Sequence, residues 1–187
     1  MDIIWQESIQ INAPISEVYR YLADFPRHIE WAQTLARLEL IRPGDSTGVG
    51  TRYRTYERQA MQADRKPREV LTQGMRVTTI CEIRELTPNR RIVWHAHTDP
   101  KALGLYADLE FEFAASATGG ALVTQRYHFH QPQPVAFMFR LMYGRNMAEK
   151  GYAQWAAGLA NIKTILEESA VDRAVASSMA GNTVVSV

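Results

Sequence analysis

A helical repeat of mostly apolar residues runs from Pro134 to Glu168, and it constrains the fold more than any other feature of the sequence. Steps of three and four residues alternate along it, which places its members on one face of an α-helix. These members are Met138, Leu141, Arg145, Ala148, Tyr152, Trp155, Leu159, Ile162 and Leu166. A continuous helix of this length would span about 50 Å, so it needs a broad apolar partner surface. Its aliphatic second half predicts core packing, whereas its first half, rich in Met, Phe, Tyr and Arg, predicts the wall of a pocket.

The partner surface is expected from seven segments with the patterning of β-strands, in which apolar and polar side chains alternate or β-branched and aromatic residues gather. They cover residues 3–11, 35–41, 51–57, 75–86, 91–98, 105–113 and 121–130. Two short helices are expected after the first strand, at residues 15–25 and, around Ile29 and Trp31, at residues 27–33. Residues 58–74 have no period and predict a long loop or a splayed hairpin tip. The order indicates an α+β domain, with a seven-stranded curved antiparallel sheet wrapped around the long C-terminal helix.

Length and charge restrict the domain count and the partners. The 187 residues suit one domain, expected over residues 1–168, with a flexible C-terminal tail over residues 169–187. A formal net charge of +1 gives no general attraction to nucleic acid. The N-terminal residues lack the pattern of a signal peptide, and no stretch is apolar enough to span a bilayer. We therefore expect a cytoplasmic protein without stable membrane insertion, either a monomer or a homodimer.

The sequence carries none of the common cofactor or nucleophile motifs. It has no phosphate-binding loop, no dinucleotide-binding glycine fingerprint and no Gly-x-Ser-x-Gly elbow. The single cysteine, Cys81, excludes an intrachain disulfide and a cysteine-based metal site, and its place within a strand predicts a buried, inert thiol. We expect neither a metal nor a nucleotide cofactor.

Two histidine pairs raise the question of a metal site. His95 and His97 share one face of a strand, as do His128 and His130 on another. The expected strand order separates the two pairs by two strand spacings, or roughly 10 Å, which fits poorly with metal–ligand bonds of about 2 Å. The sequence therefore favours a solvated outer face, on which these histidines, Arg126 and neighbouring carboxylates form cross-strand polar pairs.

Several segments resemble a known superfamily in their order and spacing. They read INAPISEVYRYLADFPRHIEW, STGVGTRYR, EIRELTPNRRIVW and GGALVTQRYHF, and the long amphipathic helix follows them. Together they resemble the START/SRPBCC superfamily, most closely its polyketide cyclase/dehydrase branch, over residues 4–168. The resemblance implies the helix-grip fold. Its members include cyclases, aromatases and carriers of lipids or hormones, so the shared fold does not by itself transfer a reaction.

A sheet curved around a helix seldom closes completely, and the gap becomes a cavity for a ligand. The strand alternation predicts that its lining comes from Tyr53, Thr55, Trp94, Leu109, Phe111, Gln125, Tyr127 and Phe129. From the helix, Met142, Arg145 and Tyr152 are expected to meet them. Such a lining suits a hydrophobic molecule that bears an oxygen or a carboxylate. Two alternatives stay open for Arg145, which either faces the cavity or extends its guanidinium to solvent.

Two functions are consistent with this cavity. In the first, the protein is a cyclase or dehydratase of secondary metabolism, in which Tyr53, Tyr127 or Arg145 holds an enolate or carbonyl oxygen and a His or Tyr moves protons. In the second, it is a non-catalytic carrier or sensor of a lipid-like or aromatic ligand. A proton-transferring residue deep in the cavity would favour the enzyme, and a purely apolar cavity would favour the carrier.

Overall fold

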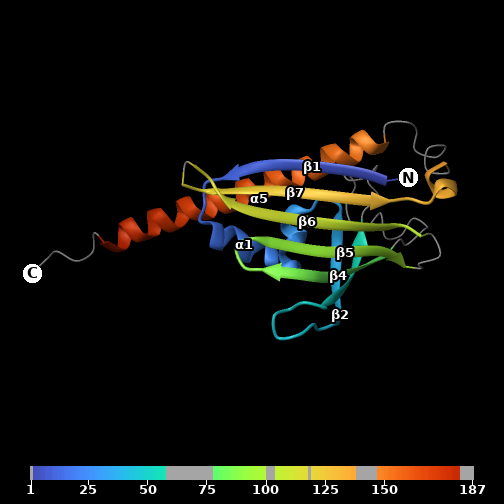
Figure 1. Cartoon of the computed structure of the whole chain (residues 1–187). Helices are drawn as coiled ribbons and strands as arrows, with labels where there is room; N and C mark the ends of the chain where they lie inside the picture. The colour runs from blue at the N-terminus through green and yellow to red at the C-terminus, as the bar shows by residue number, and fades with distance from the viewer. Residues whose placement is uncertain (1, 58–77, 100–103, 118, 138–146, 182–187) are drawn as a thin grey trace, which may run out of the picture.

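The protein is a seven-stranded antiparallel sheet with its helices packed on one face, and the computed structural model describes residues 2–57, 78–99, 104–117, 119–137 and 147–181 (Figure 1). The strands are β1 (Asp2–Ile11), β2 (Leu35–Arg42), β3 (Arg52–Glu57), β4 (Thr78–Thr87), β5 (Arg91–Asp99), β6 (Tyr106–Ala115) and β7 (Ala121–His130). They lie in the order β1-β7-β6-β5-β4-β3-β2. The predicted sheet is confirmed, and the predicted loop at residues 58–74 lies outside the described residues.

The connection between β1 and β2 carries the short helices and places these two strands at opposite edges of the sheet. It contains α1 (Ile15–Ala23), the 3-10 helix η1 (Phe25–Arg27) and α2 (His28–Trp31). Helix α1 is amphipathic and buries three side chains, Val18, Tyr21 and Leu22, against the core. The two short helices predicted after the first strand are therefore present. Within α2 the buried residues are His28 and Trp31, whereas Ile29, around which this turn was expected to pack, is exposed.

The long C-terminal helix α5 (Met147–Gly181) passes behind β1 and β7 and continues beyond the end of the sheet (Figure 1). Three of its predicted inward residues, Leu159, Ile162 and Leu166, are buried in the same core as the sheet. Apolar burial of this kind contributes roughly 1.5–3 kcal/mol for each large aliphatic side chain.

The bounds of this helix differ from the sequence prediction at its C-terminal end. The expected flexible tail from residue 169 is helical as far as Gly181. Alanine, arginine and methionine in this segment are good helix formers, even though they make no apolar stripe. At the N-terminal end, residues 133–137 are helical and α5 begins at Met147. Residues 138–146 lie outside the described residues, and with them Met138, Leu141, Met142 and Arg145.

Helix α2 packs closely on α5 because a glycine leaves space for an aromatic ring. A Cβ atom added to Gly158 would lie 3.3 Å from the Trp31 ring. Next to it, the Asn161 amide donates a hydrogen bond of 3.1 Å to the Trp31 carbonyl. This contact fixes the position of α2 and of the side chains that α2 turns toward the sheet.

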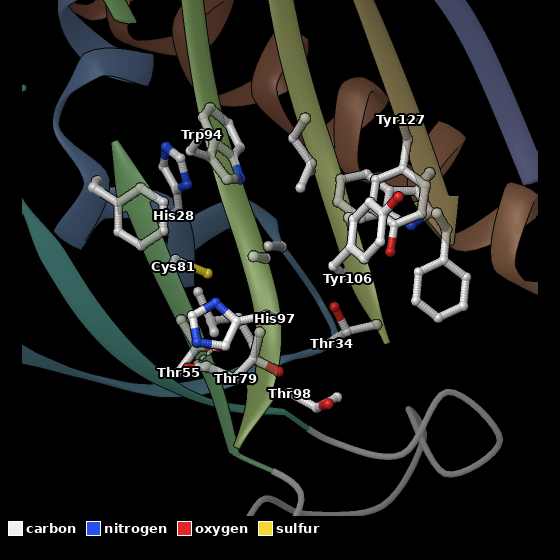
Figure 2. A pocket seen from close by; sticks show the side chains of 18 of the residues that line it. His28, Thr34, Thr55, Thr79, Cys81, Trp94, His97, Thr98, Tyr106 and Tyr127 are labelled. Atoms are coloured by element: carbon white, nitrogen blue, oxygen red, sulfur yellow. Dashed lines mark hydrogen bonds between the residues drawn. The ribbon is translucent and has the colours of Figure 1, made fainter. Parts of the chain in front are cut away.

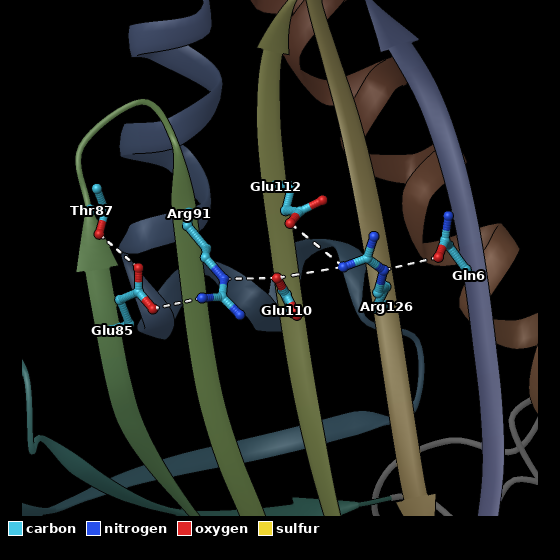
Figure 3. Close-up of polar contacts among 7 residues, drawn as sticks. All are labelled: Gln6, Glu85, Thr87, Arg91, Glu110, Glu112 and Arg126. Atoms are coloured by element: carbon cyan, nitrogen blue, oxygen red, sulfur yellow. Dashed lines mark hydrogen bonds and ion pairs between the residues drawn. The ribbon is translucent and has the colours of Figure 1, made fainter.

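The outer face of the sheet carries a ladder of charged side chains across neighbouring strands (Figure 3). Arg91 donates hydrogen bonds to Glu85 at 3.1 Å and to Glu110 at 2.7 Å. On the other side of Glu110, Arg126 donates to Gln6 at 2.9 Å. Exposed pairs of this type contribute little individually, but they keep this face solvated. The core, and any apolar cavity, therefore lies on the opposite face.

Candidate ligand-binding cavity

A cavity of about 270 Å³ lies between the inner face of the sheet, helix α2 and Trp155 of α5. It exists because the inner face carries small residues at this end of the sheet. Ala96 and Ala107 are register partners on β5 and β6, and Thr55 and Thr79 are register partners on β3 and β4. All four line the cavity. The alternation of each strand points these residues inward, and their short side chains leave the volume unfilled.

The sequence analysis predicted part of this lining. Five of the predicted site residues border the cavity: Thr55, Trp94, Leu109, Tyr127 and Phe129. Several further lining residues were missed by the sequence analysis, among them His28, Thr34, Cys81, His97, Thr98 and Tyr106 (Figure 2). Cys81 and Thr98 could have been found by extending the inward alternation of β4 and β5. Helix α2 is only four residues long, so periodicity alone does not define its inward face.

The other predicted residues lie elsewhere. Tyr53 is half-buried and stacks on Phe25 with ring centroids 4.7 Å apart. Phe25 lines the cavity and Tyr53 does not, so Tyr53 packs against the lining and is not part of it. Burial raises the pKa of Tyr53 above its usual value. Phe111 is fully buried in the core, 5.3 Å from the Trp94 ring.

Gln125 and Tyr152 belong to a small neighbouring pocket between β1, β7 and α5. The Gln125 side chain is buried there, and among the described residues its amide nitrogen has no acceptor. Tyr152 is exposed, and its hydroxyl donates to Glu7 on β1, which raises the pKa of the tyrosine. The remaining two, Met142 and Arg145, lie outside the described residues.

His28 is the most unusual group of the cavity lining, because it is a titratable side chain with only 3% of its surface exposed. Its Nε2 lies 2.9 Å from the Leu22 carbonyl oxygen. A carbonyl oxygen only accepts, so Nε2 carries the proton and Nδ1 is the ring's acceptor. Burial in an apolar environment lowers the pKa of His28 to about 4, although the hydrogen bond to Leu22 opposes this effect. At neutral pH the ring is uncharged.

Aromatic rings surround this imidazole. Its centroid lies 4.5 Å from that of Phe25, 4.9 Å from that of Trp31 and 5.0 Å from that of Trp94. Figure 2 shows His28 beside Trp94. Phe25, His28 and Trp31 are spaced three residues apart along the consecutive turns η1 and α2, which brings them to one side of the chain. This spacing groups the three rings, but it does not by itself show that they face the cavity.

The cavity is apolar and uncharged along the wall that the structure describes. None of its described lining residues is Asp, Glu, Lys or Arg. The polar side-chain groups of its described lining are hydroxyls, one thiol, the imidazoles of His28 and His97, and the indole N–H groups of the lining tryptophans. Such a wall accommodates a neutral, largely aromatic molecule and provides no partner for a full charge.

The histidines of the outer face are bound to carboxylates one strand away. His95 Nδ1 lies 2.7 Å from Asp108, its register partner on β6, and His130 Nδ1 lies 2.7 Å from Asp2, its register partner on β1. His128 lies 3.7 Å from the same Asp2 oxygen. Across the residues that the structure describes, no group of three or more His, Cys, Asp or Glu side chains is arranged to hold a metal ion. In the same residues, no helix combines the length and apolarity needed to cross a membrane.

Solved structures share this architecture at low sequence identity. The Zhui aromatase/cyclase of Streptomyces sp. R1128 is similar with a TM-score of 0.65 and 15% identity, over 89% of this chain and 94% of that one. A protein of Deinococcus radiodurans is similar with a TM-score of 0.59 and 16% identity, over 89% of this chain and 99% of that one. At such identities the likeness shows the fold, which is the helix-grip fold.

Sequence comparisons identify the family. A search of curated protein sequences found no match. The sequence model of one protein family, described as polyketide cyclase / dehydrase and lipid transport, matches residues 3–167. This match extends from β1 through most of α5 and includes every described residue of the cavity. The chain therefore belongs to the polyketide cyclase / dehydrase and lipid transport family.

Proposed function

We propose that this protein binds a hydrophobic, largely aromatic small molecule in the cavity and catalyses its cyclisation or dehydration. The observation that carries the proposal is the cavity itself, about 270 Å³ in volume, walled by aromatic rings and without a charged Asp, Glu, Lys or Arg among its described lining residues. The family includes polyketide cyclases, and the Zhui structure is that of an aromatase/cyclase.

The chemistry would be an intramolecular condensation of a polyketone chain. An enol carbon of the chain attacks a ketone carbon of the same chain, and the new alkoxide takes up the proton that the enol releases. The new carbon–carbon bond closes the ring, and loss of its hydroxyl group with a neighbouring hydrogen as one water molecule then forms a double bond, with no oxidant or reductant. The cavity would hold the chain in a folded conformation and exclude bulk water, both of which favour ring closure over hydrolysis. Neutral donors such as the Tyr127 hydroxyl would stabilise the developing oxyanion.

Ligand binding is tested with a neutral fluorescent probe, N-phenyl-1-naphthylamine, whose emission rises in apolar surroundings. The Ala107→Leu substitution adds three carbon atoms to the cavity wall and is expected to weaken binding at least about tenfold, or 1.4 kcal/mol. Ala114→Leu is the matched control, because Ala114 lies on the same strand but is exposed. Equal binding to the wild type and to Ala107→Leu would exclude this cavity as the site.

Catalysis is tested by incubating the protein with a poly-β-ketone thioester and following the product by mass spectrometry. The enzyme is expected to accelerate the loss of one water molecule, and Ala107→Leu to reduce this rate.

A carrier or sensor is the second candidate, since the described lining lacks charged Asp, Glu, Lys and Arg side chains, which are common acid–base groups. A carrier would bind the probe yet return the thioester unchanged.

A further inference from the structure

The cavity has a hydrogen-bonding group for which the protein supplies only one partner. His28 uses Nε2–H for the Leu22 carbonyl, which holds the imidazole in one tautomer and one orientation. Among the described residues, the bond to Leu22 is the hydrogen bond that His28 makes, which leaves the lone pair of Nδ1 available. Polar atoms inside native proteins are almost always hydrogen-bonded, either to protein groups or to ordered water. The lone pair of Nδ1 can therefore take a donor from outside the chain, either water or a ligand that replaces the water.

A second buried polar group lies next to it on the same short helix. The Trp31 indole N–H is buried, and among the described residues it has no acceptor. Trp31 also lines the cavity, and its ring centroid lies 4.9 Å from that of His28. The two rings that carry this acceptor and this donor thus lie next to each other at the cavity wall.

A hydroxyl group is the simple chemical group that can satisfy both needs, because it donates one hydrogen bond and also accepts. A ketone oxygen or an ether oxygen only accepts, and a hydrocarbon does neither. A carboxylate is ionised at neutral pH and has no proton to donate. With its pKa lowered to about 4, His28 carries no positive charge with which to attract a carboxylate.

We propose that His28 is the ligand-recognising residue of this cavity, and that its Nδ1 accepts a hydrogen bond from a hydroxyl group of an uncharged aromatic ligand, so that the protein selects phenol-type or enol-type ligands over hydrocarbons and carboxylates. This inference rests on the proposed ligand-binding function. The rings of Phe25, Trp31 and Trp94 exclude water around the imidazole, and a hydrogen bond is stronger in such an environment than in water.

The experiment compares four probes of similar ring size: 2-naphthol, 2-methoxynaphthalene, naphthalene and 2-naphthoate. Their affinities are measured by calorimetry or by competition with N-phenyl-1-naphthylamine. Wild-type protein is expected to bind 2-naphthol about tenfold more tightly than naphthalene or the methyl ether, and 2-naphthoate most weakly. The His28→Phe variant keeps an aromatic ring in the same place and is expected to lose the preference for 2-naphthol, with the naphthalene affinity changed less than about twofold.

A second measurement needs no substitution. In protein labelled with ¹⁵N-histidine, adding 2-naphthol is expected to shift the Nδ1 resonance of His28, and adding naphthalene is not. His95, on the outer face, serves as the internal control for both titrations. If His28→Phe does not fold, this measurement still decides the proposal.

The outcomes separate the inference from the function on which it rests. Binding of naphthalene and 2-naphthol with equal affinity, or an unmoved His28 Nδ1 resonance in saturated protein, would overturn the role of His28 and leave the cavity as an apolar site. Tighter binding of 2-naphthoate than of 2-naphthol would overturn it as well. If none of the four probes binds, the proposed ligand-binding function fails together with the inference.

Discussion

A single buried imidazole gives this protein a property that its charged surface residues do not share. Solvated side chains of the outer face remain in water when the chain unfolds, whereas His28 is moved from water into a wall of aromatic rings on folding. That environment penalises the protonated form of His28 and lowers its pKa to about 4, from 6.5 in a solvated histidine. The folded protein therefore binds fewer protons at this position than the unfolded chain in the intervening pH range.

We predict an acid-induced loss of stability that is specific to His28. A group whose pKa is lower in the folded state is protonated first in the unfolded chain, so the free energy of unfolding falls as the pH decreases from about 6.5 to 4. The full effect is roughly 3 kcal/mol, since each pKa unit corresponds to about 1.4 kcal/mol. Urea denaturation at pH 7 and at pH 4.5 is expected to show a smaller difference for His28→Phe than for the wild type.

At the scale of elements, strands were easier to predict than the short helix that carries His28. Trp94 and Leu109 could be placed inward because alternation over a whole strand defines both faces. Residues in α2 take their orientation from packing on α5, a long-range contact that no local pattern encodes. The same limit applies to Tyr152, which fits the helical repeat but binds Glu7 outside the cavity.

The contact between α2 and α5 depends on Gly158, and we predict that enlarging this residue destabilises the protein. Valine at this position would press on the Trp31 ring, which lies 3.3 Å from the expected Cβ, and is expected to cost about 1–3 kcal/mol of stability. Helix propensity alone predicts the opposite sign, because glycine is the poorer helix former. The control is Ala160→Val, at an exposed position of the same helix. A Gly158→Val variant as stable as the wild type would show that the helices are free to separate here.

At the scale of the whole molecule, helix α5 continues to Gly181, beyond the residues of the helix that are buried against the sheet. Among the α5 side chains whose burial the structure describes, up to residue 170, Leu166 is the last one buried in the core. Glu167 accepts a hydrogen bond of 2.8 Å from the Asn12 backbone, which attaches α5 to the end of β1. Beyond this point α5 continues past the end of the sheet (Figure 1). The domain boundary at residue 168 that the sequence suggests stays a prediction, which truncation can test.

Truncation after Glu168 is predicted to leave the domain folded. The change in the free energy of unfolding is expected to stay below about 1 kcal/mol, or a few degrees in Tm. Differential scanning calorimetry of the two lengths measures it, and truncation after Lys163, which removes Leu166 and Glu167, is the destabilised reference. A loss of many degrees on the shorter cut would mean that residues 169–187 pack against the domain.

The pairing of β1 with β7 has a consequence for how the chain folds as it is made. Asp2 lies opposite His130 and Ile11 opposite Ala121, so one edge of the sheet joins segments from nearly opposite ends of the domain. At synthesis rates of about 5–20 residues per second, β1 waits on the order of ten seconds for its partner strand to be made. Contacts of such long sequence separation also slow folding in isolation. Until β7 has been synthesised, β1 lacks the strand with which it pairs, and its apolar side chains cannot be buried in the native core. The native core therefore assembles late in the synthesis of the chain.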